Sequence, residues 1–201
     1  MAKIVLPSYL KEGSGRMEDA VLMHWKGIPY MRPYKKHADA KTAEQVAVRN
    51  AFTSLVADWG RLAGIVRTAW SASIEGLDIS GYNAFIGANS GARRKGEAIE
   101  LCPPMGEDQV MNFAAAPGTA GTIACTFAPI AAEKHLTLFV RKETEDASIV
   151  RIDCGAAPAS PVTVPSLETG KSYTVYAIVT DAAYADAKTV SRSVAAKAAA
   201  A

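Results

Sequence analysis

The chain has 201 residues, of which 49% are hydrophobic and 21% are charged, and its formal net charge is +2. This composition is typical of a globular protein and excludes extensive disorder. Residues 1–100 carry 14 Lys and Arg against 10 Asp and Glu, whereas residues 101–201 carry 8 against 10. A balance of +4 over a hundred residues is far below the dense basic field of a dedicated nucleic-acid binder. We therefore expect two parts of different character and no nucleic-acid partner.

No apolar stretch of the sequence is long enough to span a membrane. The apolar run at residues 4–6 is also too short for the core of a secretory signal. We therefore expect a protein that is made in the cytoplasm and spans no membrane, unless a leader was removed earlier.

The first expected element is a β-hairpin. The extended runs VLMHW and IPYMR flank the two-residue turn Lys26-Gly27, where Gly27 can take a positive φ at little steric cost. Pro29 and Pro33 lack a backbone donor, so we expect the second run at a sheet edge or in a detached ribbon.

The aromatic residues in and after this hairpin allow two interpretations. Their rings could stack on bases while the neighbouring cations contact phosphates. Alternation favours packing against protein instead, because each aromatic residue has apolar neighbours on its own face. A hairpin this short is marginal alone and needs a surface to cover it. We expect an arm that docks on a helical neighbour in another copy, with Trp25, Tyr30, Arg32 and Tyr34 as interface residues.

A first helix is expected after the linker KKHADAK. Thr42 and Gln45 match a capping box, and Gly60 is the expected end. Apolar residues then recur at spacings of four, three and four, which places them on one face. They are Val48, Phe52, Leu55 and Trp59.

Two further helices are expected. The apolar side of the second comprises Leu62, Ile65, Val66, Ala69 and Trp70. The third begins with Ser80 as N-cap, ends at Gly91, and presents Tyr82, Phe85 and Ile86. We interpret Phe52, Trp59 and Trp70 as the anchors of the helical core.

The basic segment GARRKGE, residues 91–97, is predicted to be a solvated connector, with a domain boundary near residue 95. An alternative is that Arg93, Arg94 and Lys95 contact phosphates or an acidic neighbour. Charged runs are more often solvated, so the connector is the favoured interpretation.

Beyond residue 95 the periodicity changes to two, which is typical of strands. The runs are QVMNF, TIACTF, HLTLFVRKE, SIVRIDC, VTV, SYTVYAIVT and TVSRSVAA. Three sets are expected to point inward: Ile123, Cys125 and Phe127; Leu136, Leu138 and Val140; and Val150, Ile152 and Cys154. The Ala-rich end after Ser193 either continues the last strand or is a tail. The predicted class is α+β, with a hairpin arm and three short helices in residues 1–95 and a seven-stranded β-sandwich in residues 96–201.

The run LETGKSYTVYAIVTD resembles the end of a fibronectin type III domain, through Leu167, Gly170 and Tyr173. The resemblance covers about residues 107–197 and implies that Tyr173 bonds back to nearby backbone at a corner of the sandwich. The Trp usual on the second strand is absent, with Phe127 the nearest substitute, so a more general immunoglobulin-like sandwich stays open. This likeness implies a fold and no function.

A second resemblance covers about residues 15–90. The patterns WKGIPYMR, TAEQVAVRNAF and SGYNAFIGAN are similar to an uncharacterised family of small proteins encoded in phage, prophage and bacterial genomes. The matching residues are Trp25, Gly27, Tyr30, Arg32, Gln45, Arg49, Phe52, Trp59, Trp70, Gly81, Asn83 and Phe85. The likeness implies a virion-associated or other assembly protein and transfers no catalytic residue.

The sequence contains no arrangement of residues typical of an active site. His24, His37 and His135 are isolated, and Cys102, Cys125 and Cys154 are widely spaced without a CxxC, so we expect buried thiols and no metal site. The carboxylates of EGLD and KETEDAS fall in expected loops, without the apolar surroundings that suit acid-base work. We expect no enzyme activity, no cofactor and no small-molecule substrate.

The leading hypothesis is a non-enzymatic structural subunit that forms a homo-oligomer or larger array in a phage or phage-like particle. Its partners would be copies of itself and other particle proteins. One alternative is a binding module that holds a glycan or a host surface through the loops KETEDAS and AAPASP. Another is a subunit of a bacterial surface filament, which would place the protein at the cell surface.

Overall fold

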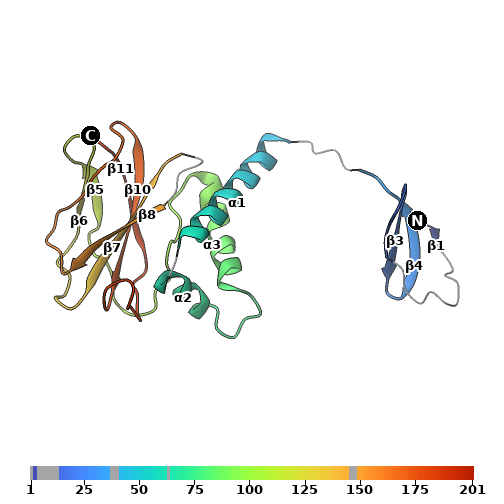
Figure 1. Cartoon of the computed structure of the whole chain (residues 1–201), viewed down its shortest axis with the longest axis horizontal. Coiled ribbons are helices and arrows are strands. Elements are labelled where there is room, and N and C mark those ends of the chain that lie inside the picture. Colours follow the sequence, from blue (N-terminus) through green and yellow to red (C-terminus); the bar gives the residue numbers. More distant parts are fainter. Residues whose placement is uncertain (1, 4–13, 37–40, 63, 145–148) are drawn as a thin grey trace. The chain divides into compact units, whose positions relative to one another are not determined.

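The computed structural model describes residues 2–3, 14–36, 41–62, 64–144 and 149–201 (Figure 1). Within them the chain forms three helices and eleven strands, which confirms the α+β class. The chain divides into two compact units, residues 1–42 and residues 43–201. The expected boundary near residue 95 therefore does not separate the compact units.

The first unit is a four-stranded antiparallel sheet of strand order β1-β4-β3-β2. Its strands are β1 (Ala2–Lys3), β2 (Gly15–Met17), β3 (Ala20–Trp25) and β4 (Ile28–Pro33). Strands β3 and β4 form the expected hairpin, with Trp25 opposite Ile28. Lys26 and Gly27 take φ values of 49° and 77°. Positive φ at both turn residues is the requirement of a type I′ hairpin turn.

The second strand of this hairpin does not lie at the sheet edge, contrary to expectation. Strand β1 pairs on the outer side of β4, opposite Tyr30 and Met31. The register of β1 leaves Pro29 and Pro33 without an outer partner among the described residues. Both prolines thus lie in β4 outside the two residue pairs described between β1 and β4.

The three helices are α1 (Ala43–Arg61), α2 (Ile65–Ala72) and α3 (Gly81–Lys95). Ser80 caps α3 as predicted, since its hydroxyl accepts a hydrogen bond from the N–H of Asn83 at 3.2 Å. The predicted stop at Gly91 is wrong. The helix continues through the basic segment and ends at Gly96, whose φ of 72° gives a left-handed cap. Most of the supposed connector is thus the last turn of a helix.

The remaining strands form two antiparallel sheets, of order β11-β10-β7-β8 and β5-β6-β9. Their bounds are β5 (Ala114–Pro117), β6 (Ile123–Thr126), β7 (His135–Lys142), β8 (Ile149–Ala156), β9 (Val162–Val164), β10 (Ser172–Thr180) and β11 (Val194–Ala199). The run QVMNF is not a strand as predicted, and Asn112 within it takes a positive φ that interrupts extended backbone. The Ala-rich end continues the last strand, because β11 pairs along β10.

One face of the four-stranded sheet packs on the three-stranded sheet. Leu138 of β7 and Val175 of β10 lie in one buried cluster with Ile123 and Cys125 of β6. The expected inward alternation is therefore confirmed for β6 and β7. In β8 it fails at Val150, whose side chain is 55% exposed.

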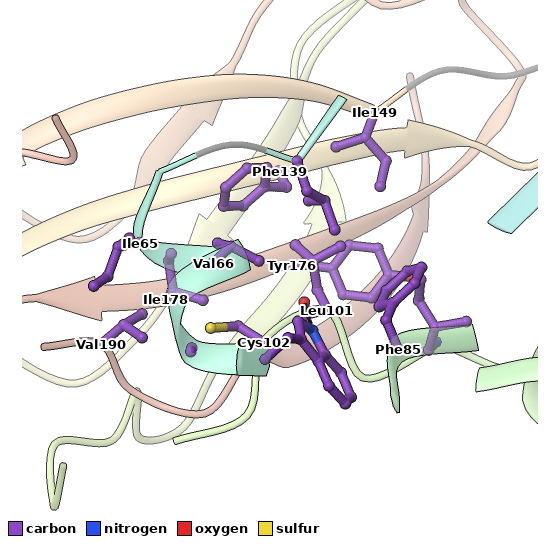
Figure 2. Close-up of a cluster of buried hydrophobic side chains, with 14 of the residues drawn as sticks. Ile65, Val66, Phe85, Leu101, Cys102, Phe139, Ile149, Tyr176, Ile178 and Val190 are labelled. Carbon is purple, nitrogen blue, oxygen red and sulfur yellow. Dashed lines mark hydrogen bonds between the residues drawn. The ribbon is translucent and has the colours of Figure 1, made fainter. Parts of the chain in front are cut away.

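The other face of the same sheet packs on the helices (Figure 2). Phe139, Tyr176 and Ile178 point from β7 and β10 into a cluster with Val66 of α2 and Phe85 of α3. Because the sheet is buried on both sides, eight consecutive residues of β10, 173–180, are buried. The helices and both sheets form one unit because the two clusters lie on opposite faces of the same four-stranded sheet.

Candidate assembly interface

The hairpin register of the first unit places the expected interface residues on one face of its sheet. Directly opposite residues share a face in an antiparallel pair. The Trp25 face, as we name it, consists of Val21, Met23, Trp25, Ile28, Tyr30 and Arg32. The hydroxyl of Tyr30 lies 3.4 Å from the sulfur of Met23 on this face.

Tyr34 borders the Trp25 face. Arg16 lies opposite Val21 in the register of β2 and β3. Its guanidinium carbon is 3.8 Å from the centre of the Tyr34 ring, in a cation–π contact. The structure thus places Trp25, Tyr30 and Arg32 on one face with Tyr34 beside it, and their role as interface residues stays a prediction.

Trp25, Ile28 and Arg32 of the Trp25 face are exposed, whereas Val21, Met23 and Tyr30 are partly buried. The exposed fractions are 64% for Trp25 and 43% for Ile28, and none of residues 14–36 is buried. A small sheet is stable in water only when an apolar face is covered. An apolar face of this kind marks a surface that another protein can cover.

A second exposed apolar surface lies on α1. Val48, Phe52 and Val56 follow one another at four-residue spacing and are 50%, 49% and 38% exposed; we call them the α1 row. Phe52 was expected to be a core anchor, and this prediction is wrong. The buried face of α1 carries Leu55 and Asp58 instead, so the α1 row lies on the flank of that face.

The other expected core anchors are buried or partly buried. Trp70 is 4% exposed, and its indole N–H donates to the carbonyl of Leu101 at 3.0 Å. Trp59 is half-buried, and its ring centre lies 5.4 Å from that of Phe85. Both tryptophans therefore stabilise the helical layer as predicted.

Tyr173 also has its predicted position and contact. Its ring lies in the cluster between the two sheets, and its oxygen accepts a hydrogen bond from the N–H of Glu168 at 3.0 Å. This is the tyrosine-corner contact that the sequence resemblance implies.

A buried charge cluster was not predicted. The carboxylate of Asp58 in α1 contacts the guanidinium groups of Arg93 in α3 and Arg141 in β7. Burial raises the pKa of Asp58, although both guanidinium groups act in the opposite direction. Burial also lowers the pKa of Arg93. Asp58 is thus an acidic neighbour of the basic segment 91–97, which was the alternative interpretation of that segment. The signal in the sequence was an aspartate on the side of α1 that packs against the core.

The three thiols show no sign of catalytic activation. Burial raises the pKa of Cys102 to about 12 and the pKa values of Cys125 and Cys154 to about 11. Cys102 and Cys125 are buried as expected, whereas Cys154 is only partly buried.

Within the described part of the chain, no three His, Cys, Asp or Glu residues gather as a metal site would require. No described helix is both long and apolar enough to cross a membrane.

The two loops considered for ligand binding differ in what the structure describes. Residues 145–148 of KETEDAS lie outside the described residues, as do residues 37–40 of the linker KKHADAK. The loop AAPASP is described and largely exposed, and its sequence offers neither an aromatic ring nor a charged group.

No family model matches the chain, and no curated protein matches it. Solved structures that are similar include the fn3 domain of the human collagen alpha-1(XX) chain. That domain is 21% identical, with a TM-score of 0.39, and the match covers 48% of this chain and 88% of the other. A likeness at this level carries no argument about function.

Proposed function

We propose that this protein is a non-enzymatic structural subunit that assembles with copies of itself through the Trp25 face. The observation that carries the proposal is the absence of any buried residue in 14–36, although this segment forms a regular sheet with an aromatic and aliphatic face. Association covers such a face and removes its apolar area from water, at about 25 cal/mol per Å².

The α1 row of a second copy is the surface that we propose the Trp25 face covers. Its three side chains are apolar, regularly spaced and exposed in the described chain. An extended arm on an amphipathic helix of a neighbour would bury both surfaces in one contact. In this contact the Trp25 face of one subunit would bind the α1 row of the next, so the interface would be heterologous. Heterologous contacts form rings when they close and longer arrays when they do not.

The particle that we propose is a phage or phage-like virion. The support is the sequence resemblance of residues 15–90 to small proteins of phage and prophage genomes. We further propose that the two sheets form a fibronectin type III sandwich that serves as a rigid spacer. Two observations support this: a four-stranded sheet packs on a three-stranded sheet, and the Glu168 N–H donates a hydrogen bond to the Tyr173 oxygen.

Site-specific photo-crosslinking tests this proposal. Trp25 is replaced by a benzophenone amino acid in the full chain, and equal amounts of light and ¹⁵N-labelled protein are mixed before irradiation. Crosslinked peptides that join a light residue 25 to a labelled segment 48–56, and the reverse, would support the contact. The same amino acid at exposed Lys171 is the matched control. Crosslinks confined to one copy, or equal yields at both positions, would contradict it.

A further inference from the structure

A cavity of about 330 Å³ lies where α1, the end of α3, and strands β7 and β10 meet. Its lining is rich in hydrogen-bond donors. They include Asn50 and Ser54 of α1, Arg93 and Arg94 of α3, Arg141 of β7 and Thr174 of β10.

Positive charge exceeds negative charge beside this cavity. Asp58 is buried between Arg93 and Arg141, so one carboxylate faces two guanidinium groups. The side chains of the two arginines are only 12% and 7% exposed. An unmatched charge at this depth is costly unless a further counter-charge approaches.

The guanidinium groups retain unused donors. Each has five N–H bonds. Arg141 uses its Nε toward Asp58 at 3.4 Å and one Nη2 hydrogen toward Ser54 at 3.0 Å. The Nε of Arg93 is buried and has no hydrogen-bond partner in the described structure. Arg94 lines the cavity and forms no ion pair with any described residue.

The carboxylates in the cavity wall reduce this excess to one charge, because Arg93, Arg94, Arg141 and Lys197 face Asp58, Glu97 and Glu143. Burial opposes the ionisation of Glu143, but Lys197 at 2.8 Å, the Thr174 hydroxyl at 2.6 Å and the Arg141 guanidinium together lower its pKa, so Glu143 already supplies part of the counter-charge. Glu97 also contributes to the lining, and like Arg94 it is exposed, so water screens both of these charges.

We propose that this cavity binds the oxyanion group of a small ligand, a carboxylate or a phosphate. Guanidinium groups bind both through paired, charge-assisted hydrogen bonds. An oxyanion that contacts Arg94 in the cavity would lie beside the guanidinium groups of Arg93 and Arg141 and add to their counter-charge. Asn50 and Thr174 offer neutral polar groups for the rest of the ligand.

The cluster also has a structural role, because it connects α1, α3 and β7. That role requires Asp58 with Arg93 and Arg141, but it does not require Arg94. A substitution of Arg94 therefore tests ligand binding without affecting folding, because it leaves the buried ion pairs intact.

The test is an NMR titration of the ¹⁵N-labelled full chain at constant ionic strength. One arm uses inorganic phosphate and the other uses succinate, which distinguishes the two oxyanion classes. We expect saturable shifts at the amides of Ser54, Thr144 and Thr174, below about 10 mM ligand in at least one arm. Arg94→Gln should weaken this binding about tenfold. Arg61→Gln, at the exposed end of α1, is the matched control and should leave it unchanged.

The outcomes decide the proposal in both directions. Saturable shifts at the cavity that weaken in Arg94→Gln and persist in Arg61→Gln would support it. The proposal fails if neither probe gives saturable shifts at the cavity. It also fails if the shifts spread over surface cations, or if both variants respond alike.

Discussion

The phenolic oxygen of Tyr173 accepts a hydrogen bond from the backbone N–H of Glu168, while its ring packs between the two sheets. Removing only the hydroxyl, in Tyr173→Phe, leaves that N–H without its partner. We expect the free energy of unfolding to fall by about 1–2 kcal/mol, measured by urea denaturation. Tyr82→Phe removes a hydroxyl from a half-buried tyrosine of α3 and is the control. Equal losses in both variants would contradict a special role for the Tyr173 contact.

Trp70 and Phe52 should differ sharply in their effect on stability. Trp70→Ala removes a buried ring and its hydrogen bond to Leu101, so we expect a loss of about 3–5 kcal/mol. Phe52→Ser changes a side chain that is 49% exposed, and the monomer should stay within about 0.5 kcal/mol of the parent. Chemical denaturation at low protein concentration measures both. A large loss in Phe52→Ser would place this ring in the core after all.

Asp58→Ala should be strongly destabilising. Its side chain is 1% exposed, and its removal leaves the guanidinium groups of Arg93 and Arg141 buried without a counter-charge. We expect a loss of about 3–5 kcal/mol in the free energy of unfolding. Asp78→Ala removes a carboxylate from an exposed loop and should cost little. Similar losses in the two variants would show that the cluster contributes no stability.

The thiols should resist modification in the folded protein. Burial raises the pKa values of Cys102 to about 12 and of Cys125 and Cys154 to about 11, so few thiolates form at pH 8. We expect Ellman's reagent to label three thiols per chain only after unfolding. Rapid labelling of the native chain at pH 8 would contradict this.

The same pKa shifts predict a pH dependence of stability. An unfolded thiol loses its proton near the ordinary value of 9, whereas the folded protein retains it up to about 11. The folded state therefore binds more protons in this window, and the unfolding midpoint should fall as pH rises through it. Thermal unfolding between pH 8 and 11 measures the effect, and a midpoint that rises with pH would contradict it.

The sequence predicts the elements of this fold better than their packing. Local signals identify the Lys26-Gly27 turn and the Ser80 cap, because each depends on a few neighbouring residues. The predicted end of α3 at Gly91 was wrong because the sequence offers two glycines, Gly91 and Gly96, as candidates for the C-cap. Only Gly96 has the left-handed backbone, and a helix tolerates the other at about 1 kcal/mol.

Contacts between distant segments were harder to predict. The run in β7 alternates well enough to suggest one buried face, but the continuous burial of β7 and β10 reflects helices on the second face. The partner of Arg93 lies 35 residues away in sequence, and no local pattern encodes that pairing. The same limit applies to Phe52, because a small rotation of α1 decides which apolar residues are covered.

Sedimentation velocity of the full chain over a wide range of concentrations tests the central claim most directly. The parent protein should associate as concentration rises, because association is proposed to cover the Trp25 face. The variant Trp25→Ser with Ile28→Ser should stay monomeric and folded by circular dichroism, while Leu77→Ser, at an exposed loop position, should associate like the parent. A parent protein that remains monomeric at the highest concentration, or a double variant that associates equally well, would contradict the account.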